Sequence, residues 1–521
     1  MLTAIRTRLP LALLTLFLAV AVVILTLSAL LGVHAHLVWL LLAIVLGLVF
    51  WTFKGNFADG VLVWLILTAL FPAHFWRLEL PGFFNVTIGR IGIVALGLLF
   101  LLRSSVRGLP RLPLTIIASM TVLTAYFAFS AWRAGWTLTV PGAPPYYRLF
   151  VGYIFPFSAF VFALAGFSAR RSADEPPESR WPDRFTARIL WTFFIFGMYL
   201  TFTALCERFE VWSLVWPRFI ANPNVGLNFG RARGPFAEAF AMALTLTFLF
   251  FVNLFLARRS QRPTKILLWV LNIPVLAAIY FTYTRTAYVC LIISAAVWLW
   301  LIVGRLRRTA ALAIITAVLV TAVAVNWATV SSRERSVGGL AEIRPILGRV
   351  AVSKLALELT AEHPLLGVGF GHYRHAVWSK QMDVAGTTTI YARGLSQSVA
   401  VLSVLCETGL IGLILYLAVF FAILVPSIRL YRRSVPGING PVSRDFVVLF
   451  WILYIQIALM SVTADPSYYP YTTGLLMFFA GLVAGLNLSV SGQSAGSQPE
   501  ASMLHQSLPP APQPSRSVPS G

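Results

Sequence analysis

The sequence predicts an all-α polytopic membrane protein with about 12–14 transmembrane helices and one long extracytoplasmic loop that contains an amphipathic helix. Three observations predict this class. Hydrophobic residues make up 58% of the chain and charged residues only 11%, which is far from the composition of soluble globular proteins. Apolar runs of about 20 residues, the length that crosses a bilayer, recur along the chain. Between two of these runs lies one long polar stretch, residues 330–397.

The apolar runs give roughly 14 helices, or 12 to 13 if adjacent runs merge. The first run has a basic start, but it is too long for a signal peptide, so we expect it to be retained as a span. The predicted spans are 9–32, 36–52, 60–76, 88–102, 112–132, 148–168, 186–205, 236–257, 265–281, 286–303, 309–328, 398–425, 446–464 and 471–488.

These runs divide the chain into four predicted parts. Residues 1–329 form an N-terminal transmembrane bundle of about 11 helices, and residues 330–397 form the long loop. Residues 398–488 form the C-terminal transmembrane helices. Residues 489–521 are rich in Ser, Pro and Gln, which predicts a disordered tail with no chemistry of its own.

The net charge of +22 is explained by membrane topology rather than by nucleic-acid binding. Connections rich in Lys and Arg, such as "RSSVRGLPR", "ARRSQRPTK" and "RLYRRS", alternate with connections that have few basic residues, such as "GVHAH" and "ADPSYYPY". The positive-inside rule then predicts that both termini are cytoplasmic and that the long loop lies outside. The chain's three cysteines form no CxxC pair, so neither a disulfide framework nor a zinc site is expected.

Several arginines fall on the predicted outer side, where the positive-inside rule does not require them. Arg285, in "YTRTAY", is the most informative because it lies in a tight connection between two apolar helices. Each such arginine could simply snorkel or pair with a glutamate. Several on one face favour a guanidinium site for phosphate oxygens, as on a phosphate-bearing lipid. The outer arginines are Arg231, Arg233, Arg285, Arg333, Arg335, Arg344 and Arg349.

The long loop contains the segment "GRVAVSKLALELTAEHPLLGVGFGHY". Its first part has apolar residues at helical spacing and stops at Pro364, which predicts an amphipathic helix near the membrane surface. Gly367, Gly369 and Gly371 then permit positive φ angles and a sharp turn back toward the membrane. His363 is expected to be a helix-end residue favoured by the helix dipole. Two further histidines, His372 and His375, are polar, outside and beside the turn.

This segment, followed by "LSVLCETGLIGLILYL", resembles the signature region of the O-antigen ligase and polymerase superfamily of bacterial inner-membrane proteins. "YTRTAYVCLI" is similar to the family's short Arg-bearing segment, and "RARGPFAEAFAMAL" to its earlier Arg-Gly-Phe segment. The resemblance covers about residues 231–417, and the N-terminal third matches only as generic membrane helices.

The resemblance implies glycan transfer at the periplasmic face of the inner membrane. Members of the family move a glycan from an undecaprenyl diphosphate carrier to an acceptor hydroxyl, on lipid A core or on a growing polysaccharide, with no metal and no cofactor. Arginines must then stabilise the diphosphate leaving group. Matched by motif, Arg285 and Arg349 are the first candidates for this role and Arg233 the third.

The family also implies a general base, and here the sequence departs from the pattern. Members usually place a His-Asn pair nine residues before the glutamate that corresponds to Glu407, where this chain has Ser398 and Val399. Either a variable loop shifts the register, or the chain binds a lipid-linked glycan without transferring it, or His372, His375 or Glu407 serves as the base. Glu407 has a second interpretation, in which it holds a loop arginine.

Other function classes are less well matched. A secondary transporter of this size should show internal repeats and buried ionisable groups in its spans, and no two halves of this chain resemble each other. A metal-dependent lipid-carrier glycosyltransferase should place a carboxylate pair in its first outer loop, but that loop is "GVHAH". Ligase and polymerase members share the quoted motifs, so the sequence does not separate them.

Overall fold

The computed structural model describes residues 57–75, 77, 85–107, 110, 112–137, 142–168, 181–303, 331–332, 344–378, 380–384, 388–391, 397, 399–434 and 444–496. The predicted spans 9–32, 36–52 and 309–328 lie outside these residues, as do Arg333, Arg335, Ser398 and the tail from residue 497.

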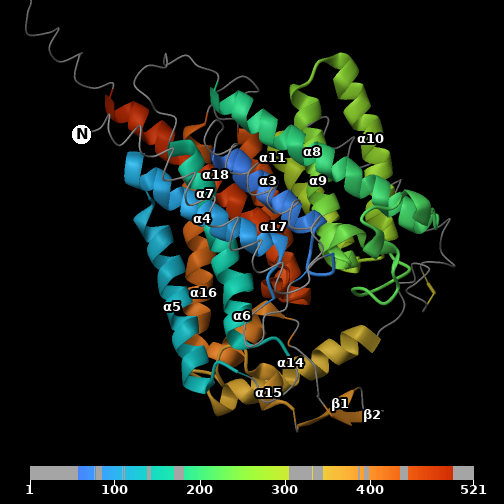
Figure 1. The fold of residues 1–521 in the computed structure, drawn as a ribbon, viewed down its shortest axis with the longest axis vertical. Helices are drawn as coiled ribbons and strands as arrows, with labels where there is room; N and C mark the ends of the chain where they lie inside the picture. Colours follow the sequence, from blue (N-terminus) through green and yellow to red (C-terminus); the bar gives the residue numbers. More distant parts are fainter. Residues whose placement is uncertain are drawn as a thin grey trace, which may run out of the picture.

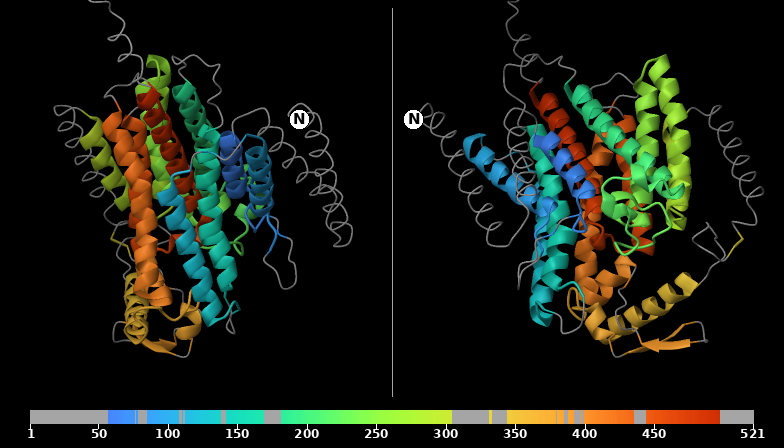
Figure 2. Two further views of the ribbon diagram at one scale, coloured as in Figure 1. Left: turned by 90° about the vertical axis from the view of Figure 1, so that its left-hand side faces the viewer. Right: turned by 45° about the vertical axis from the view of Figure 1, so that its right-hand side comes forward.

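The described residues confirm an all-α polytopic membrane protein (Figures 1 and 2). Nine of their helices are long and apolar enough to cross a membrane, and two shorter apolar helices accompany them. The α-helices are α3 (Phe57–Leu70), α4 (Ile88–Arg107), α5 (Leu114–Ala134), α6 (Pro145–Leu149), α7 (Phe155–Ser168), α8 (Trp181–Arg208), α9 (Ala239–Arg259), α10 (Arg262–Phe281), α11 (Arg285–Ile302), α14 (Arg344–Glu362), α15 (Tyr373–Ala376), α16 (Ala400–Arg433), α17 (Arg444–Thr463) and α18 (Pro470–Gly496).

Short elements join these helices. A π-helical turn η1 (Phe150–Ile154) continues α6 into α7, and 3-10 turns include η2 (Trp212–Leu214), η3 (Arg218–Ala221), η4 (Gly234–Phe236) and η6 (Pro466–Tyr468). The strands β1 (Gln381–Val384) and β2 (Thr388–Tyr391) pair antiparallel, with Gln381 opposite Tyr391. Helix α18 continues past residue 488, where the sequence predicted the tail to begin.

The core lies between α7, α9 and α18. Helix α7 packs along α18, α10 packs along α9, and α16 packs along α5. Helices α9 and α18 are the most buried spans, and they are apolar around their whole circumference. By contrast, α10, α11 and α16 expose large apolar side chains such as Ile273, Trp300 and Phe421, as lipid-facing helices do.

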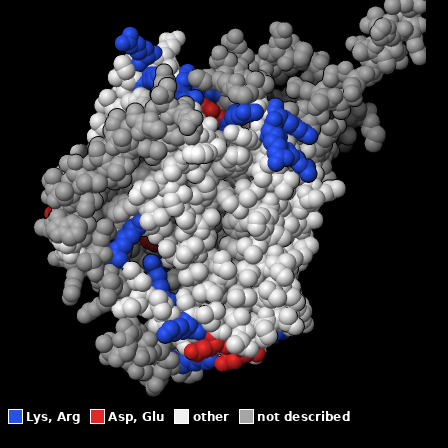
Figure 3. All heavy atoms as spheres, turned by 180° about the vertical axis from the view of Figure 1, so that it is seen from behind, with Lys and Arg blue, Asp and Glu red and all other residues white. Residues whose placement is uncertain are grey.

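The two ends of the bundle differ in character. The end that carries α14, α15 and the β1–β2 hairpin is called here the loop end, and it lies at the bottom of Figure 1. At the opposite, basic end, Lys and Arg side chains gather (Figure 3). Basic residues there lie in the last turns of α9 and α16 and at the start of α10. Two ion pairs join neighbouring helices at this end, Arg188–Asp59 at 2.6 Å and Arg258–Asp445 at 3.0 Å.

The predicted amphipathic helix is confirmed as α14. Its apolar stripe, which includes Val352, Leu355 and Leu359, is buried against residues of α15 and against Cys406 at the start of α16. The Tyr373 hydroxyl donates a hydrogen bond of 3.0 Å to the Val352 carbonyl. Helix α14 therefore lies across the loop end rather than along the bundle, as the right-hand view in Figure 2 shows.

The glycine turn after α14 is confirmed and docks on a break in α16. Gly367, Gly369 and Gly371 have φ angles of 63°, 116° and 79°, and Gly409 within α16 has a φ of 67°. The Gly369 amide donates to the Glu407 carbonyl at 2.8 Å, and the Leu410 amide donates to the Pro364 carbonyl at 2.9 Å. A Cβ on Gly367 would lie 2.4 Å from the Glu407 carbonyl carbon. Only glycine permits this close contact between the two backbones.

Candidate functional site

A buried arginine at the loop end organises the first part of the site. Arg148, in α6, is 3% exposed. Its Nη1 donates to both carboxylate oxygens of Glu407 at 2.8 and 2.6 Å, and its Nη2 donates to Asp465 at 2.6 Å. Its Nη2 and Nε also donate to the hydroxyls of Ser403 and Ser467, at 2.9 and 3.1 Å. These five residues are called here the Arg148 cluster, and they tie α6, α16 and η6 together.

The glycine turn completes this cluster. The rings of Phe370 and Tyr468 both lie against the Arg148 guanidinium, with centroids 5.1 and 5.0 Å from its central carbon. The Tyr373 amide also approaches one Glu407 oxygen at 3.4 Å. The Glu407 carboxylate is therefore occupied by a bidentate arginine and by backbone from the turn.

Glu407 was predicted either to act in catalysis or to hold a loop arginine. Its contacts favour the second role, because it is 2% exposed and its oxygens already accept hydrogen bonds from Arg148. Arg148 was not predictable as a site residue from the sequence, because it lies at the edge of a predicted span, in "PPYYRLF". The available signal was the presence of Glu407 and Asp465 beside apolar runs, because carboxylates there require a partner.

The two histidines beside the turn differ in exposure. His372 is buried, its Nδ1 lies 3.1 Å from the Phe370 carbonyl oxygen, and burial lowers its pKa. His375 is exposed on α15, with its ring centroid 6.3 Å from that of His372. Their roles as bases stay predictions.

Arg285 is the first residue of α11, so its backbone amide belongs to the positive end of that helix. Arg231 lies directly against the preceding turn. Its guanidinium donates to the carbonyls of Thr282 and Tyr283, both at 2.8 Å, and to the Thr284 hydroxyl at 3.0 Å. The structure thus brings Arg231 and Arg285, here called the α11 arginine pair, to one helix N-terminus at the loop end.

Arg233 has a different environment from the α11 arginine pair. It is 1% exposed, and its guanidinium donates to the backbone carbonyls of Ile220, Asn222 and Val225. Its own amide and that of Gly234 donate to the Glu207 carboxylate, at 3.2 and 2.7 Å. These contacts favour a structural role for Arg233 over the predicted diphosphate contact.

Arg349 is exposed on α14 and faces the same end of the bundle. Burial and the nearby Glu238 carboxyl raise the pKa of Tyr469, and the positive charge of Arg349 opposes this rise. Arg349 is therefore within electrostatic reach of Tyr469, at the junction of η6 and α18.

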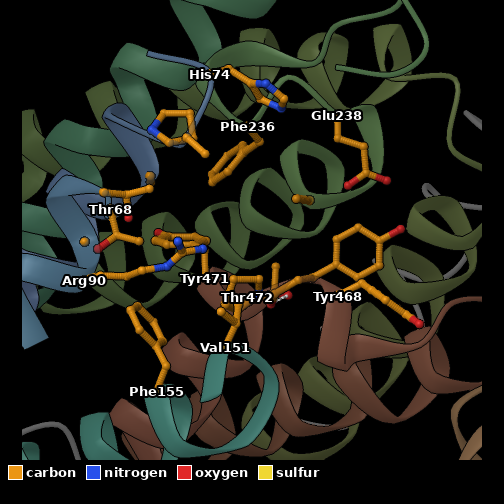
Figure 4. Close-up of a pocket in the computed structure, with 18 of the residues that line it drawn as sticks. Thr68, His74, Arg90, Val151, Phe155, Phe236, Glu238, Tyr468, Tyr471 and Thr472 are labelled. Carbon is orange, nitrogen blue, oxygen red and sulfur yellow. Dashed lines mark hydrogen bonds between the residues drawn. The ribbon is translucent and has the colours of Figure 1, made fainter. Parts of the chain in front are cut away.

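A cavity of about 350 Å³ opens between the ends of α3 and α6 and the starts of α4, α9 and α18 (Figure 4). This volume lies within the range of small-molecule sites. Its walls carry several aromatic rings, and the ionisable side chains His74, Arg90, Arg148 and Glu238. The Arg90 guanidinium donates to the Tyr147 hydroxyl at 2.8 Å. Neither Glu407 nor the histidines beside the turn line this cavity.

Within the described part of the chain, no group of three or more His, Cys, Asp or Glu side chains is arranged to hold a metal ion. Cations at the loop end are instead supplied by arginine. The arrangement can therefore bind an anion at the N-terminus of α11, with an aromatic cavity nearby.

Comparison with protein-family models matches residues 270–417 to a family described as O-antigen ligase. The matched region runs from α10 to α16 and includes Arg285, Arg349, the glycine turn and Glu407. Arg148, Glu238 and Asp465 lie outside it. A comparison with curated proteins found no match.

Proposed function

We propose that the chain is a member of the O-antigen ligase superfamily, whose family model matches residues 270–417, and that it transfers a glycan from an undecaprenyl diphosphate carrier to an acceptor hydroxyl. The acceptor is a lipid A core in a ligase or a growing polysaccharide in a polymerase. The observation that supports this proposal best is the position of Arg285 as the first residue of α11, because an arginine at the N-terminus of a helix favours an anion there. Arg231 holds the preceding turn in place through its hydrogen bonds to Thr282, Tyr283 and Thr284.

The reaction places negative charge where these groups lie. As the bond between the anomeric carbon and the phosphate oxygen breaks, the electron pair moves to the diphosphate. Fixed guanidinium and backbone N–H donors stabilise this charge without reorganising. The planar guanidinium also matches two phosphate oxygens at once, which an ammonium group does not. Arg349, on the helix that crosses the loop end, is the second arginine proposed to contact the diphosphate.

The charge asymmetry of the bundle supports a periplasmic location for this site. The basic end carries the clusters that the positive-inside rule assigns to the cytoplasm, and the loop end is opposite to it. In a bacterial inner membrane, the site would then face the periplasm, where the carrier presents its glycan.

The test uses purified protein in lipid vesicles with an undecaprenyl diphosphate-linked oligosaccharide and candidate acceptors. We expect acceptor-dependent release of undecaprenyl diphosphate by the wild type, and a loss of about 10²–10³-fold in Arg285→Ala. Arg349→Ala should also lose release. The matched control is Arg432→Ala, an exposed arginine at the basic end, which should release carrier at the wild-type rate.

Two outcomes would contradict the proposal. Full activity in Arg285→Ala would show that the α11 arginine pair does not bind the diphosphate. Binding of the carrier with no release under any acceptor would mean that the chain holds a lipid-linked glycan without transferring it.

A further inference from the structure

The proposed function requires a group that accepts the proton of the acceptor hydroxyl, and the chain has serine where the family pattern has histidine. Of the three predicted bases, Glu407 is held by Arg148, and neither His372 nor His375 lines the cavity. A base must reach the acceptor, so the ionisable side chains on the cavity wall are the relevant set. Among the described residues of that wall, Glu238 carries the only carboxylate.

The backbone before α9 directs Glu238 into the cavity. Glu238 occupies the N-cap position of α9, but its side chain makes no capping hydrogen bond. The preceding residue, Ala237, is left-handed, with a φ of 53°, and closes the turn η4. The Glu238 carboxylate instead accepts a hydrogen bond from the Tyr469 hydroxyl and lines the cavity. Figure 4 shows it on one side of the cavity, with Arg90 on the other.

Glu238 is also next to the α11 arginine pair. The neighbouring Ala239 carbonyl lies 3.5 Å from the Thr284 hydroxyl, and Thr284 directly precedes Arg285. The charge of Arg231 acts on the Glu238 carboxyl. A carboxylate thus lies between a site for the leaving group and a cavity with room for a sugar.

From this geometry we infer that Glu238 is the general base of the transfer, an inference that rests on the proposed function. The acceptor hydroxyl oxygen forms a bond to the anomeric carbon, and its proton passes to the Glu238 carboxylate. The bond from the anomeric carbon to the diphosphate oxygen breaks, and its electron pair leaves with undecaprenyl diphosphate. Glu238 then returns the proton to solvent.

The acid–base character of Glu238 suits this role. Burial raises the pKa of its carboxyl to about 7, against the opposing effects of the Tyr469 hydrogen bond and the charge of Arg231. His74 also lines the cavity, and burial and nearby arginines lower its pKa. A base must be deprotonated to act, so activity should fall as the pH drops through about 7.

The cavity is suited to a sugar acceptor. Tyr147, Tyr468, Tyr469 and Tyr471 line it, together with phenylalanine rings. Such rings offer flat apolar faces to a pyranose, and the tyrosine hydroxyls can hydrogen-bond to its hydroxyl groups. A glycan acceptor therefore fits the walls better than a purely aliphatic one.

The test compares Glu238→Gln and Glu238→Ala with wild type in vesicles that contain the undecaprenyl diphosphate-linked oligosaccharide. Glutamine keeps the size of the side chain and an oxygen that accepts from Tyr469, but it is not a base. Carrier release to an acceptor hydroxyl should fall by about 10²–10⁴-fold, with carrier binding and melting temperature unchanged. The matched control is Glu358→Gln, an exposed glutamate on α14 that should retain activity.

Sodium azide separates a base from a structural residue. Azide is an anionic nucleophile with no proton to remove, so it should restore carrier release in Glu238→Ala and yield a glycosyl azide. It should not restore Arg285→Ala. Wild-type turnover in Glu238→Gln overturns the inference but leaves the proposed function intact. If His74→Ala loses turnover while Glu238→Gln keeps it, the inference is also overturned and the proposed function is again unaffected. Absence of azide rescue in a variant that still binds carrier also overturns it.

If the wild type releases no carrier with any acceptor or with azide, the proposed function itself fails, and the inference fails with it. A pH profile gives an independent readout. The wild-type rate should rise toward a plateau above about pH 7, whereas the residual rate of Glu238→Gln should not show this rise. An identical profile in both proteins contradicts the inference.

Discussion

The Arg148 cluster and the cavity wall around Glu238 use the same kinds of side chain for different purposes. In the cluster, the Arg148 guanidinium donates to four side chains, and its two carboxylate partners are buried. On the cavity wall, Glu238 accepts from one tyrosine and stays partly exposed to the cavity. In the first arrangement the charged groups are hydrogen-bonded to one another, although Arg148 and Ser467 also reach the cavity wall. In the second, the carboxylate faces the cavity.

The comparison shows how to separate structural charges from reactive ones in this membrane bundle. A buried ion pair is costly to desolvate and is retained when each partner is fully hydrogen-bonded. Removing one partner then damages folding before it affects chemistry. A charge beside a cavity can be removed with little loss of stability, and the loss appears in turnover.

The largest effect is expected for Arg148→Met. This change leaves the Glu407 and Asp465 carboxylates buried without a cation, so we expect a loss of about 3–5 kcal/mol in the free energy of unfolding. Thermal unfolding in detergent would measure it, together with the fraction of protein that inserts. Lysine should rescue poorly, because one ammonium cannot replace five directed N–H donors.

Glu407→Gln is the matched comparison for this prediction. With Glu407 neutral, Arg148 still pairs with Asp465 at 2.6 Å, so no net buried charge remains. The loss should therefore be clearly smaller than in Arg148→Met. Equal losses in the two variants would mean that Glu407, and not Arg148, organises the cluster.

The sequence predicted one half of this cluster and missed the other. Glu407 followed by Thr-Gly was recognisable from its motif, and a loop arginine was expected to hold it. The identity of that arginine was not predictable, because Arg148 and Glu407 are 259 positions apart and the chain contains many arginines. Local patterns predict helices and turns, but they do not specify which distant charges are brought together when spans pack.

The second prediction concerns the turn that closes over this cluster. In Gly367→Ala, the new Cβ would approach the Glu407 carbonyl carbon to 2.4 Å at a φ of 63°. Backbone cannot move aside as a flexible side chain can, so we expect a loss of about 2–4 kcal/mol in stability. Chemical denaturation in detergent would measure it.

Gly348→Ala is the control for this substitution. Gly348 lies within α14, and a Cβ there meets nothing within 4 Å. Alanine in a helix interior should instead stabilise the protein by about 0.5–1 kcal/mol. If both variants shift stability in the same direction, the turn is not the docking point that the backbone contacts indicate.

The third prediction separates Arg233 from Arg285, which the sequence grouped as candidates for the diphosphate. Arg233→Met removes hydrogen bonds to three backbone carbonyls and should cost about 1.5–3 kcal/mol in stability. Carrier release per folded molecule should change little. Arg285→Ala should show the reverse, with unchanged stability and lost release. A tenfold or greater loss of carrier release in folded Arg233→Met would instead indicate that Arg233 contacts the diphosphate.

The sequence could predict on which side of the membrane these arginines lie, but not which residues each of them contacts. The amphipathic stripe of α14 and the positive φ angles of the turn depend on local patterns, and the structure confirms them. The predicted span ends agree less well, because α3 ends at Leu70 rather than at 76, and α16 and α18 continue to Arg433 and Gly496, past the predicted 425 and 488. The orientation of Glu238 depends on Ala237, an alanine in the left-handed conformation, which residue type alone does not indicate. That feature, and the cavity that it faces, come from tertiary packing.

The smallest effect is expected at the outer surface of α14. Lys380 and Glu362 form an ion pair at 3.0 Å, with side chains 29% and 53% exposed. Solvent screens such a pair, so Glu362→Gln should cost only about 0–1 kcal/mol, and less in high salt. Thermal unfolding at low and high ionic strength measures this change. If Glu362→Gln lost as much stability as Arg148→Met, pairing alone, rather than burial, would determine how much a charge contributes to the stability of this protein. The distinction between the Arg148 cluster and the cavity wall would then not hold.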